Sequence, residues 1–192
     1  MSQRLQLIRY ISSANIESNI DGLIDLPTAP LTSITDLTGS HPQPSNDSLA
    51  GVTHDLHLKT TYYAAQVPVW LDVTSSPAEW ATTFLTPEAK EVLDVLGGLV
   101  VVFSLPSTTG PSRDETRNLL SHVGRVVREG LGGWQWDGVS IGIGVGETSD
   151  VDEWEDCCAD GGLEFIQVKA AVSDKRNEFG GRFVSTSKVS KY

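Results

Sequence analysis

The sequence predicts an α/β fold in which a mostly parallel β-sheet has helices on both faces. Residues 99–106, LVVVFSLP, form a continuous apolar run, which is typical of a strand covered on both faces. Residues 112–131 carry an apolar stripe at helical spacing. Strand-like and helix-like segments then alternate as far as residue 170, which favours parallel strands joined by right-handed crossovers.

The first 50 residues give weaker signals. Residues 1–21 contain two arginines, several serines and no acidic residue before Glu17, and we interpret them as an unmatched, poorly ordered leader. Residues 22–27, GLIDLP, are a thin candidate for the first strand, and a turn with a weak helix is expected in residues 27–39. Residues 40–51 are rich in Pro, Ser, Asn and Gly, which predicts a loop.

Two neighbouring strands are predicted between residues 54 and 72. Apolar and polar residues alternate in residues 54–60 and again in residues 67–72, as the two-residue period of a strand requires. The short link between them favours an antiparallel pair. Pro68 is tolerated only where the ladder does not need its missing N–H.

An interrupted helix is expected in residues 76–97. Pro77 and Pro87 each suit a first helical turn, and the pair Gly97 and Gly98 predicts a stop before the strand that follows.

The long amphipathic helix begins with a capping-box spacing between Ser112 and Glu115. Its apolar stripe comprises Leu119, Leu120, Val123, Val126, Val127 and Leu131.

The last elements complete the alternation. Residues 139–146 predict a buried strand, and residues 163–170 predict a final strand. Between them, residues 152–160 predict a short helix whose inner face comprises Trp154, Cys157 and Cys158.

Composition limits the partners. The chain has 192 residues and a formal net charge of −11, so its average field repels phosphate backbones and anionic lipid. We therefore expect no direct nucleic-acid partner and no membrane insertion. The two cysteines are adjacent, which fits neither a disulfide framework nor a zinc site and favours a reducing compartment. A soluble, cytoplasmic protein without a metal or cofactor is expected.

The order of the predicted elements is the layout of small GTPases, a P-loop NTPase type of fold, but the nucleotide site is degenerate. A P-loop needs GxxxxGK[ST], whereas residues 26–35, LPTAPLTSIT, contain neither glycine nor lysine. Asp72 stands where such proteins bring an aspartate to magnesium, yet Ser75 replaces the phosphate-contacting glycine. Gly-Val-Gly-Glu at residues 144–147 stands in place of an Asn-Lys-x-Asp guanine reader.

Phosphoryl transfer depends on positioning and charge neutralisation, and these residues supply little of either. We interpret Asp72 as a vestigial position that caps the following turn. No catalytic residue is predicted, so we expect the chain not to be an enzyme.

Other chemical motifs have simpler interpretations. In GIGVG, residues 142–146, the third glycine comes one position too early for GxGxxG, so close packing within the sheet is favoured. His54 and His57 are three apart in a strand and point to opposite faces, so they cannot chelate one metal together. Cys157 with a nearby base could act as a nucleophile, but helical packing is favoured.

Two groups of residues are candidates for partner binding. The acidic run of residues 147–160 is either a solvated face that complements a helix dipole or a surface for a basic partner. Several aromatic residues are either core or interface anchors. The candidates are Tyr62, Tyr63, Trp70, Trp80, Asp152, Glu153, Trp154 and Glu155.

Several segments carry a family likeness that covers residues 22–180. The most specific are KTTYYAAQVPVWLD at residues 59–72, WEDCCADGGLEFI at residues 154–166 and NEFG at residues 177–180. These segments resemble the alpha- and gamma-adaptin-binding protein family, whose fungal members are called increased recombination centres protein six.

The resemblance implies a pseudoGTPase domain that binds large and small subunits of clathrin adaptor complexes and acts as a chaperone or regulator in vesicle-mediated transport. The fungal name also implies a role in recombination, gross chromosomal rearrangement and telomere healing. A residual nucleotide-binding switch is a further alternative.

The chain departs from the family pattern at both ends. Relatives begin with an apolar first strand, where this chain has the leader and GLIDLP, and after NEFG they continue into a helical segment, where this chain has GRFVSTSKVSKY. We therefore expect a domain at residues 22–180 that is incomplete at both ends, followed by a disordered tail at residues 181–192. The uncovered apolar sheet surface implies either a covering partner or marginal stability.

Overall fold

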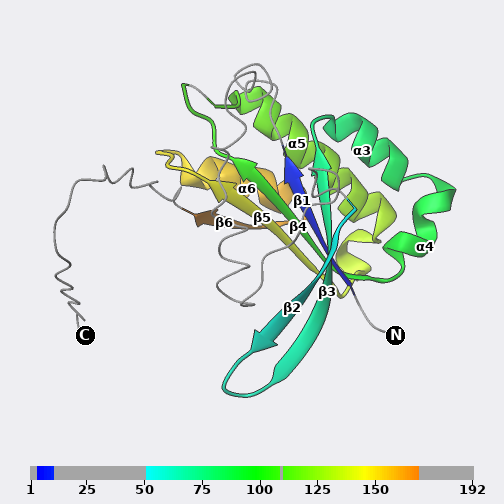
Figure 1. Cartoon of the computed structure of the whole chain (residues 1–192). Helices are drawn as coiled ribbons and strands as arrows, with labels where there is room; N and C mark the ends of the chain where they lie inside the picture. Colours follow the sequence, from blue (N-terminus) through cyan, green and yellow to red (C-terminus); the bar gives the residue numbers. More distant parts are fainter. Residues whose placement is uncertain (1–3, 11–50, 109, 169–192) are drawn as a thin grey trace, which may run out of the picture.

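A single six-stranded sheet organises the chain (Figure 1). The computed structural model describes residues 4–10, 51–108 and 110–168. The strand order is β2-β3-β1-β4-β5-β6, and every neighbouring pair is parallel except β2 and β3. The mixed α/β sheet with one antiparallel edge strand is therefore confirmed. The elements are β1 (Arg4–Tyr10), β2 (Thr53–Lys59), β3 (Ala64–Thr74), α3 (Pro77–Phe84), η2 (Pro87–Ala89), α4 (Lys90–Leu93), β4 (Leu96–Ser104), α5 (Arg113–Arg125), η3 (Val126–Gly130), η4 (Gly133–Gln135), β5 (Val139–Val145), α6 (Val151–Asp160) and β6 (Glu164–Val168).

The central strand β1 comes from the segment predicted to be a leader. It pairs in parallel with both β3 and β4, so the expectation of a poorly ordered leader is wrong for residues 4–10. The strand was hidden because polar residues interrupt its apolar pattern. Gln6 is fully buried beside Leu99, and its side-chain amide has no hydrogen-bond partner in the described part of the chain. The predictions for residues 22–50 and for the tail at 181–192 lie outside the described residues.

The helices of the described residues pack on one face of the sheet (Figure 1). Their core includes Ile8, Leu99, Val101 and Phe103 from the strands. A second apolar cluster lies on the opposite face and comprises Leu7, Val69, Leu71, Val100, Val102 and Val145. Within the described ranges, helices on both faces are thus confirmed for one face only.

Strand β4 begins earlier than predicted. The pair Gly97 and Gly98 lies inside the strand, so the expectation of a stop there is wrong. Glycine serves close packing at this point, because a Cβ on Gly98 would lie 2.5 Å from Leu5 Cδ1. The packing interpretation of GIGVG holds for the same reason, since a Cβ on Gly142 would lie 2.8 Å from Cys158 Sγ.

Helix α5 follows the prediction closely. Ser112 Oγ accepts the Glu115 N–H at 3.1 Å, and the predicted stripe is buried through Val127. The last turn widens into the π-helical segment η3. No helix among the described residues is long and apolar enough to cross a membrane.

Candidate functional site: a protruding strand arm and its neighbours

Asp72 joins β3 to the helix layer. Its Oδ1 accepts the Val73 N–H at 2.9 Å, and its Oδ2 accepts the indole N–H of Trp80 at 3.2 Å. The N–H of Ser76 in the following turn is bonded instead by Thr74 Oγ1, at 3.3 Å. The expectation that Asp72 caps this turn is therefore wrong, because the carboxylate is engaged by Trp80.

The carboxyl ends of the strands are where open α/β sheets bind ligands. Two arginines on the first turns of α5 lie beside this edge, and both are engaged by carboxylates. Arg113 forms ion pairs with Asp150 and with Glu153, the latter at 2.6 Å, and Arg117 binds Glu153 at 2.7 Å. This edge therefore presents paired arginines and acidic side chains, an arrangement poorly suited to an anionic phosphate.

The hairpin of β2 and β3 extends beyond the sheet (Figure 1). Strand β3 pairs with β1 only from Val69 onward. Among the described strands, the earlier residues of β3 pair with β2 alone. Residues 59–66 at the end of this ribbon are all exposed, and we call them the arm. Pro68 lies in the part of β3 that pairs with β2 before β3 reaches β1. Proline is tolerated there because the ladder with β1 does not need its missing N–H.

The tip of the arm presents two adjacent tyrosines. Thr60 fixes the turn, because its Oγ1 accepts the N–H of Tyr62 at 3.2 Å and that of Tyr63 at 3.1 Å, while its own N–H donates to the Tyr63 carbonyl at 2.8 Å. The Tyr62 side chain is 94% exposed and Tyr63 is 58% exposed. Neither ring contributes to the core, so both are available for contact.

A groove lies at the base of the ribbon. Trp70 is partly exposed, and its register partner Thr53 lines the same groove. The groove has a volume of about 580 Å³ and is lined by Arg4, Thr53, Pro68, Trp70, Glu91, Val92, Val95 and Leu96. Three predicted aromatic candidates, the two tyrosines and Trp70, therefore share one hairpin.

The other aromatic candidates are core residues. Trp80 is 8% exposed and stacks on Phe84 with ring centroids 4.7 Å apart, and Trp154 is 1% exposed. Burial removes both from any surface for a partner.

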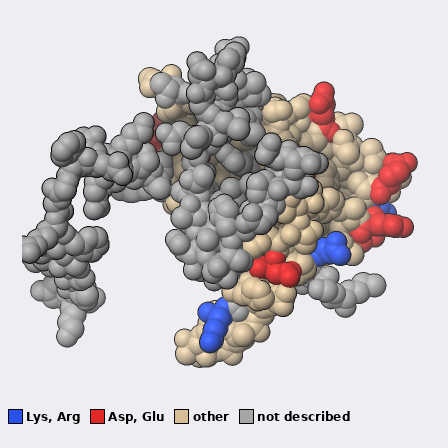
Figure 2. All heavy atoms as spheres, in the orientation of Figure 1, with Lys and Arg blue, Asp and Glu red and all other residues tan. Residues whose placement is uncertain are grey.

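The acidic candidates lie on α6, away from the hairpin. Asp152 and Glu155 are exposed, while Glu153 is held by the two arginines of α5. Acidic side chains also gather over the α3 and α4 side of the molecule, whereas the arm at the bottom of the view is largely uncharged (Figure 2). The structure does not bring the arm and the acidic helix into one site.

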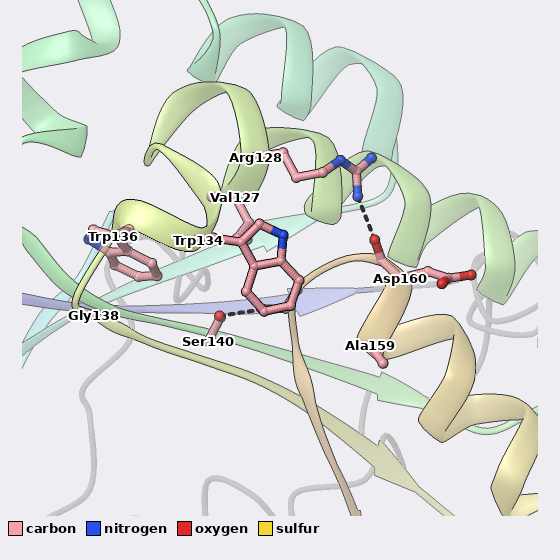
Figure 3. Close-up of a pocket in the computed structure, with 10 residues that line it drawn as sticks. Val127, Arg128, Trp134, Trp136, Gly138, Ser140, Ala159 and Asp160 are labelled. Carbon is pink, nitrogen blue, oxygen red and sulfur yellow. Dashed lines mark hydrogen bonds between the residues drawn. The ribbon is translucent and has the colours of Figure 1, made fainter.

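A cleft missed in the sequence lies beside the turn η4 (Figure 3). Trp134 is 96% exposed at its mouth, and Arg128 Nη1 donates to the Asp160 carbonyl at 2.8 Å along one wall. A sequence signal for this cleft exists in residues 132–138, GGWQWDG. Glycines flank two tryptophans there, and this pattern predicts an aromatic residue on a turn.

The chain has relatives among known proteins, although no family model matches it. An uncharacterized protein of Schizosaccharomyces pombe is 35% identical over 72 residues, which cover 35% of this chain and 29% of that protein. Increased recombination centers protein 6 of Kluyveromyces lactis is 31% identical over 61 residues, which cover 32% of this chain and 26% of that protein. The resemblance to increased recombination centres protein six is confirmed.

These matches span less than a third of the length of either relative. Among solved structures, yeast Irc6p, described as a conserved clathrin accessory protein, matches with a TM-score of 0.48 and 13% identity. That match covers 88% of this chain and 79% of Irc6p.

Proposed function

We propose that this chain is a non-catalytic, GTPase-like module of the cytoplasm that binds large and small subunits of clathrin adaptor complexes. It assists their assembly or regulation in vesicle-mediated transport. The observation that carries the proposal is the arm, where Tyr62 and Tyr63 are exposed on a turn fixed by Thr60. The relationship to increased recombination centers protein 6 supports the choice of partner through the implied family role.

Tyrosine suits a binding surface for a physical reason. Its ring offers a large and rigid contact area, and its hydroxyl finds a hydrogen bond at an interface. The arm has one charged residue, Lys59, among its eight, whereas the chain as a whole has a net charge of −11. A partner that buries the arm therefore removes few charges from water.

The absence of phosphate-binding groups supports the non-catalytic part of the proposal. Residues 11–50 follow β1 and contain neither lysine nor arginine, and no lysine anywhere in the chain follows a glycine, as a P-loop would require. At the carboxyl edge of the sheet, Arg113 and Arg117 are paired with carboxylates.

The test is the affinity of purified adaptor large and small subunits for the double variant Tyr62→Ser/Tyr63→Ser. Loss of the two interface anchors, at about 2 kcal/mol or more for the pair, weakens binding at least about 30-fold. The pair Tyr62→Phe/Tyr63→Phe keeps the rings and retains most of the affinity.

The matched control is Val139→Ser, which removes an apolar side chain that is 54% exposed and distant in sequence from the hairpin. It leaves binding unchanged, and the thermal unfolding midpoints of all variants show that they are folded. Wild-type affinity in the serine double variant, or a wild-type chain that captures neither subunit, contradicts the proposal.

A further inference from the structure

Strand β2 is an edge of the sheet, and no strand lies on its outer side among the described residues (Figure 1). Two hydrogen bonds show which of its main-chain groups point outward. The Leu71 N–H donates to the Val52 carbonyl at 2.8 Å, and the Thr60 N–H donates to the Tyr63 carbonyl at 2.8 Å. Because the direction alternates along a strand, even-numbered residues of β2 bond to β3 and odd-numbered residues point outward. The outward residues are Thr53, Asp55, His57 and Lys59.

The outer side of β2 keeps the capacity to pair with another strand. Within the described part of the chain, no hydrogen bond reaches the main chain of Asp55, His57 or Lys59 from that side, and all three side chains are exposed. Edge strands are commonly protected from pairing by shortness, proline, a bulge or charge. Strand β2 has seven residues, no proline and an unbroken register with β3. The remaining protection is charge, and Asp55 and Lys59 carry opposite signs.

The sequence of β2 is complementary to itself in the antiparallel direction. With a twofold axis through His57, Asp55 of one copy lies opposite Lys59 of the other, and the same pair recurs beyond the axis. Opposite charges directly across an antiparallel pair stabilise it, and like charges destabilise it. An axis through Asp55 or through Lys59 would oppose like charges, and an axis through Leu56 would leave Lys59 opposite Thr53. The axis through His57 is therefore favoured.

Both charged side chains are available for this contact. Neither Asp55 nor Lys59 forms an ion pair within the described residues. The Asp55 carboxylate accepts one hydrogen bond, on Oδ2 from Gln66 Nε2 at 2.8 Å, which leaves Oδ1 open. Because successive side chains of a strand alternate between its faces, Asp55, His57 and Lys59 share one face.

The distribution of charge over the molecule also favours a second copy at this edge. A net charge of −11 opposes self-association in general. Acidic side chains gather over the α3 and α4 side, however, whereas the ribbon is largely uncharged (Figure 2). The outer side of β2 carries one acid and one base, so two copies meet there with little net repulsion. The pattern matches a second copy in both halves of the contact, which an unrelated strand has no reason to do.

We propose that two copies of this chain associate through β2, antiparallel and centred on His57, so that one sheet continues across both copies. The three opposed outward pairs exchange about six main-chain hydrogen bonds, two for each pair. The pairs of Asp55 with Lys59 fix the register. This dimer goes beyond adaptor binding and does not depend on it, because Tyr62 and Tyr63 lie in the turn past the paired residues.

Sedimentation equilibrium of the full chain measures the dimer. The wild-type chain approaches twice the mass of one chain as its concentration rises through the micromolar range. Asp55→Lys or Lys59→Asp weakens association about tenfold or more, because each turns two attractive pairs into two repulsive ones. The swap Asp55→Lys/Lys59→Asp restores both pairs and recovers most of the affinity. Asp152→Lys, at an exposed position of α6, changes the net charge as much as Asp55→Lys and leaves association unchanged.

A cross-link tests the position of the axis. A residue on a twofold axis lies opposite its own copy with Cα atoms about 5.5 Å apart, which fits a disulfide. His57→Cys, in a Cys157→Ala chain whose remaining native thiol Cys158 is buried, forms a covalent dimer under mild oxidation. Thr53→Cys in the same chain is the control and stays uncross-linked, because its own copy lies roughly 26 Å away along the strands.

A wild-type chain that stays monomeric at high micromolar concentration overturns the proposal and leaves this edge to a strand of another protein. A dimer that survives both single charge reversals, a swap that restores nothing, or a cross-link that forms as fast in Thr53→Cys as in His57→Cys also overturns it. None of these measurements uses an adaptor subunit, so failure of the dimer is distinguishable from failure of adaptor binding through the arm.

Discussion

Among single side chains, Cys158 links burial to a measurable property most directly. It is fully buried on the inner face of α6, and burial raises its pKa from 9.0 to about 12, with a further contribution from Cys157. Below pH 9 the thiol is neutral in both the folded and the unfolded chain. Above pH 9 the unfolded chain loses the proton first, so the free energy of unfolding falls as pH rises toward 12.

This effect is measured by urea unfolding between about pH 8 and pH 9.5. At higher pH the hydroxyl of Tyr10 begins to lose its proton in the unfolded chain, while burial raises its pKa in the folded chain, and this adds a slope of its own. Burial raises the pKa of Cys157 as well, so Cys157→Ala/Cys158→Ala is the control that removes the slope. A slope of the same size in this double variant contradicts the assignment to the thiols.

The aromatic candidates show what a residue type alone can predict. The sequence left Tyr62, Tyr63 and Trp80 open between core and interface, and it placed Trp154 on the inner face of its helix. The tyrosines occupy the link of a hairpin and are exposed, whereas the tryptophans lie on inner helical faces and are buried. The exposure of each aromatic side chain followed from where it lies in its hairpin or helix. The hydrogen bond from Trp80 to Asp72 depends on a tertiary contact, which no local sequence pattern predicts.

For the helices, the approach of α5 to α6 depends on one small residue. A Cβ on Gly124 would lie 2.5 Å from Gly161 Cα. Gly124→Ala gains about 1 kcal/mol of helix propensity but loses roughly 1–3 kcal/mol to overpacking, so the net effect is a lower melting temperature. Thermal unfolding monitored by circular dichroism measures it.

Ser121→Ala, at an exposed position of the same helix, is the control and leaves the melting temperature nearly unchanged. A Gly124→Ala protein that melts above the wild type would show that the two helices separate without cost.

The strands show where periodicity succeeds and where it fails. Strand β4 was predictable because it is a continuous apolar run, β5 because apolar residues and glycine dominate it, and the hairpin because its residues alternate. Strand β1 was missed because its pattern is broken by Gln6, a polar side chain buried in the core without a partner in the described part of the chain. Only pairing with β3 and β4 on both sides reveals it as the central strand.

At the scale of the whole described structure, the candidate surfaces lie at separate places on the sheet. The arm lies at one edge of the sheet with β2, the cleft of Trp134 lies near β5 and β6, and the ion pairs of Arg113 and Arg117 occupy the carboxyl edge (Figure 1). The sequence predicted the mostly parallel sheet but not this separation, because the separation depends on which elements become neighbours.

The central claim is that the chain works by holding protein partners and does so without a nucleotide. The most direct measurement is the affinity of the full chain for a purified adaptor subunit, with and without GTP and Mg²⁺ at millimolar concentration. The account predicts the same dissociation constant in both conditions and no GTP consumed. A tenfold change in affinity, which is a coupling of about 1.4 kcal/mol, or measurable release of phosphate, would contradict it.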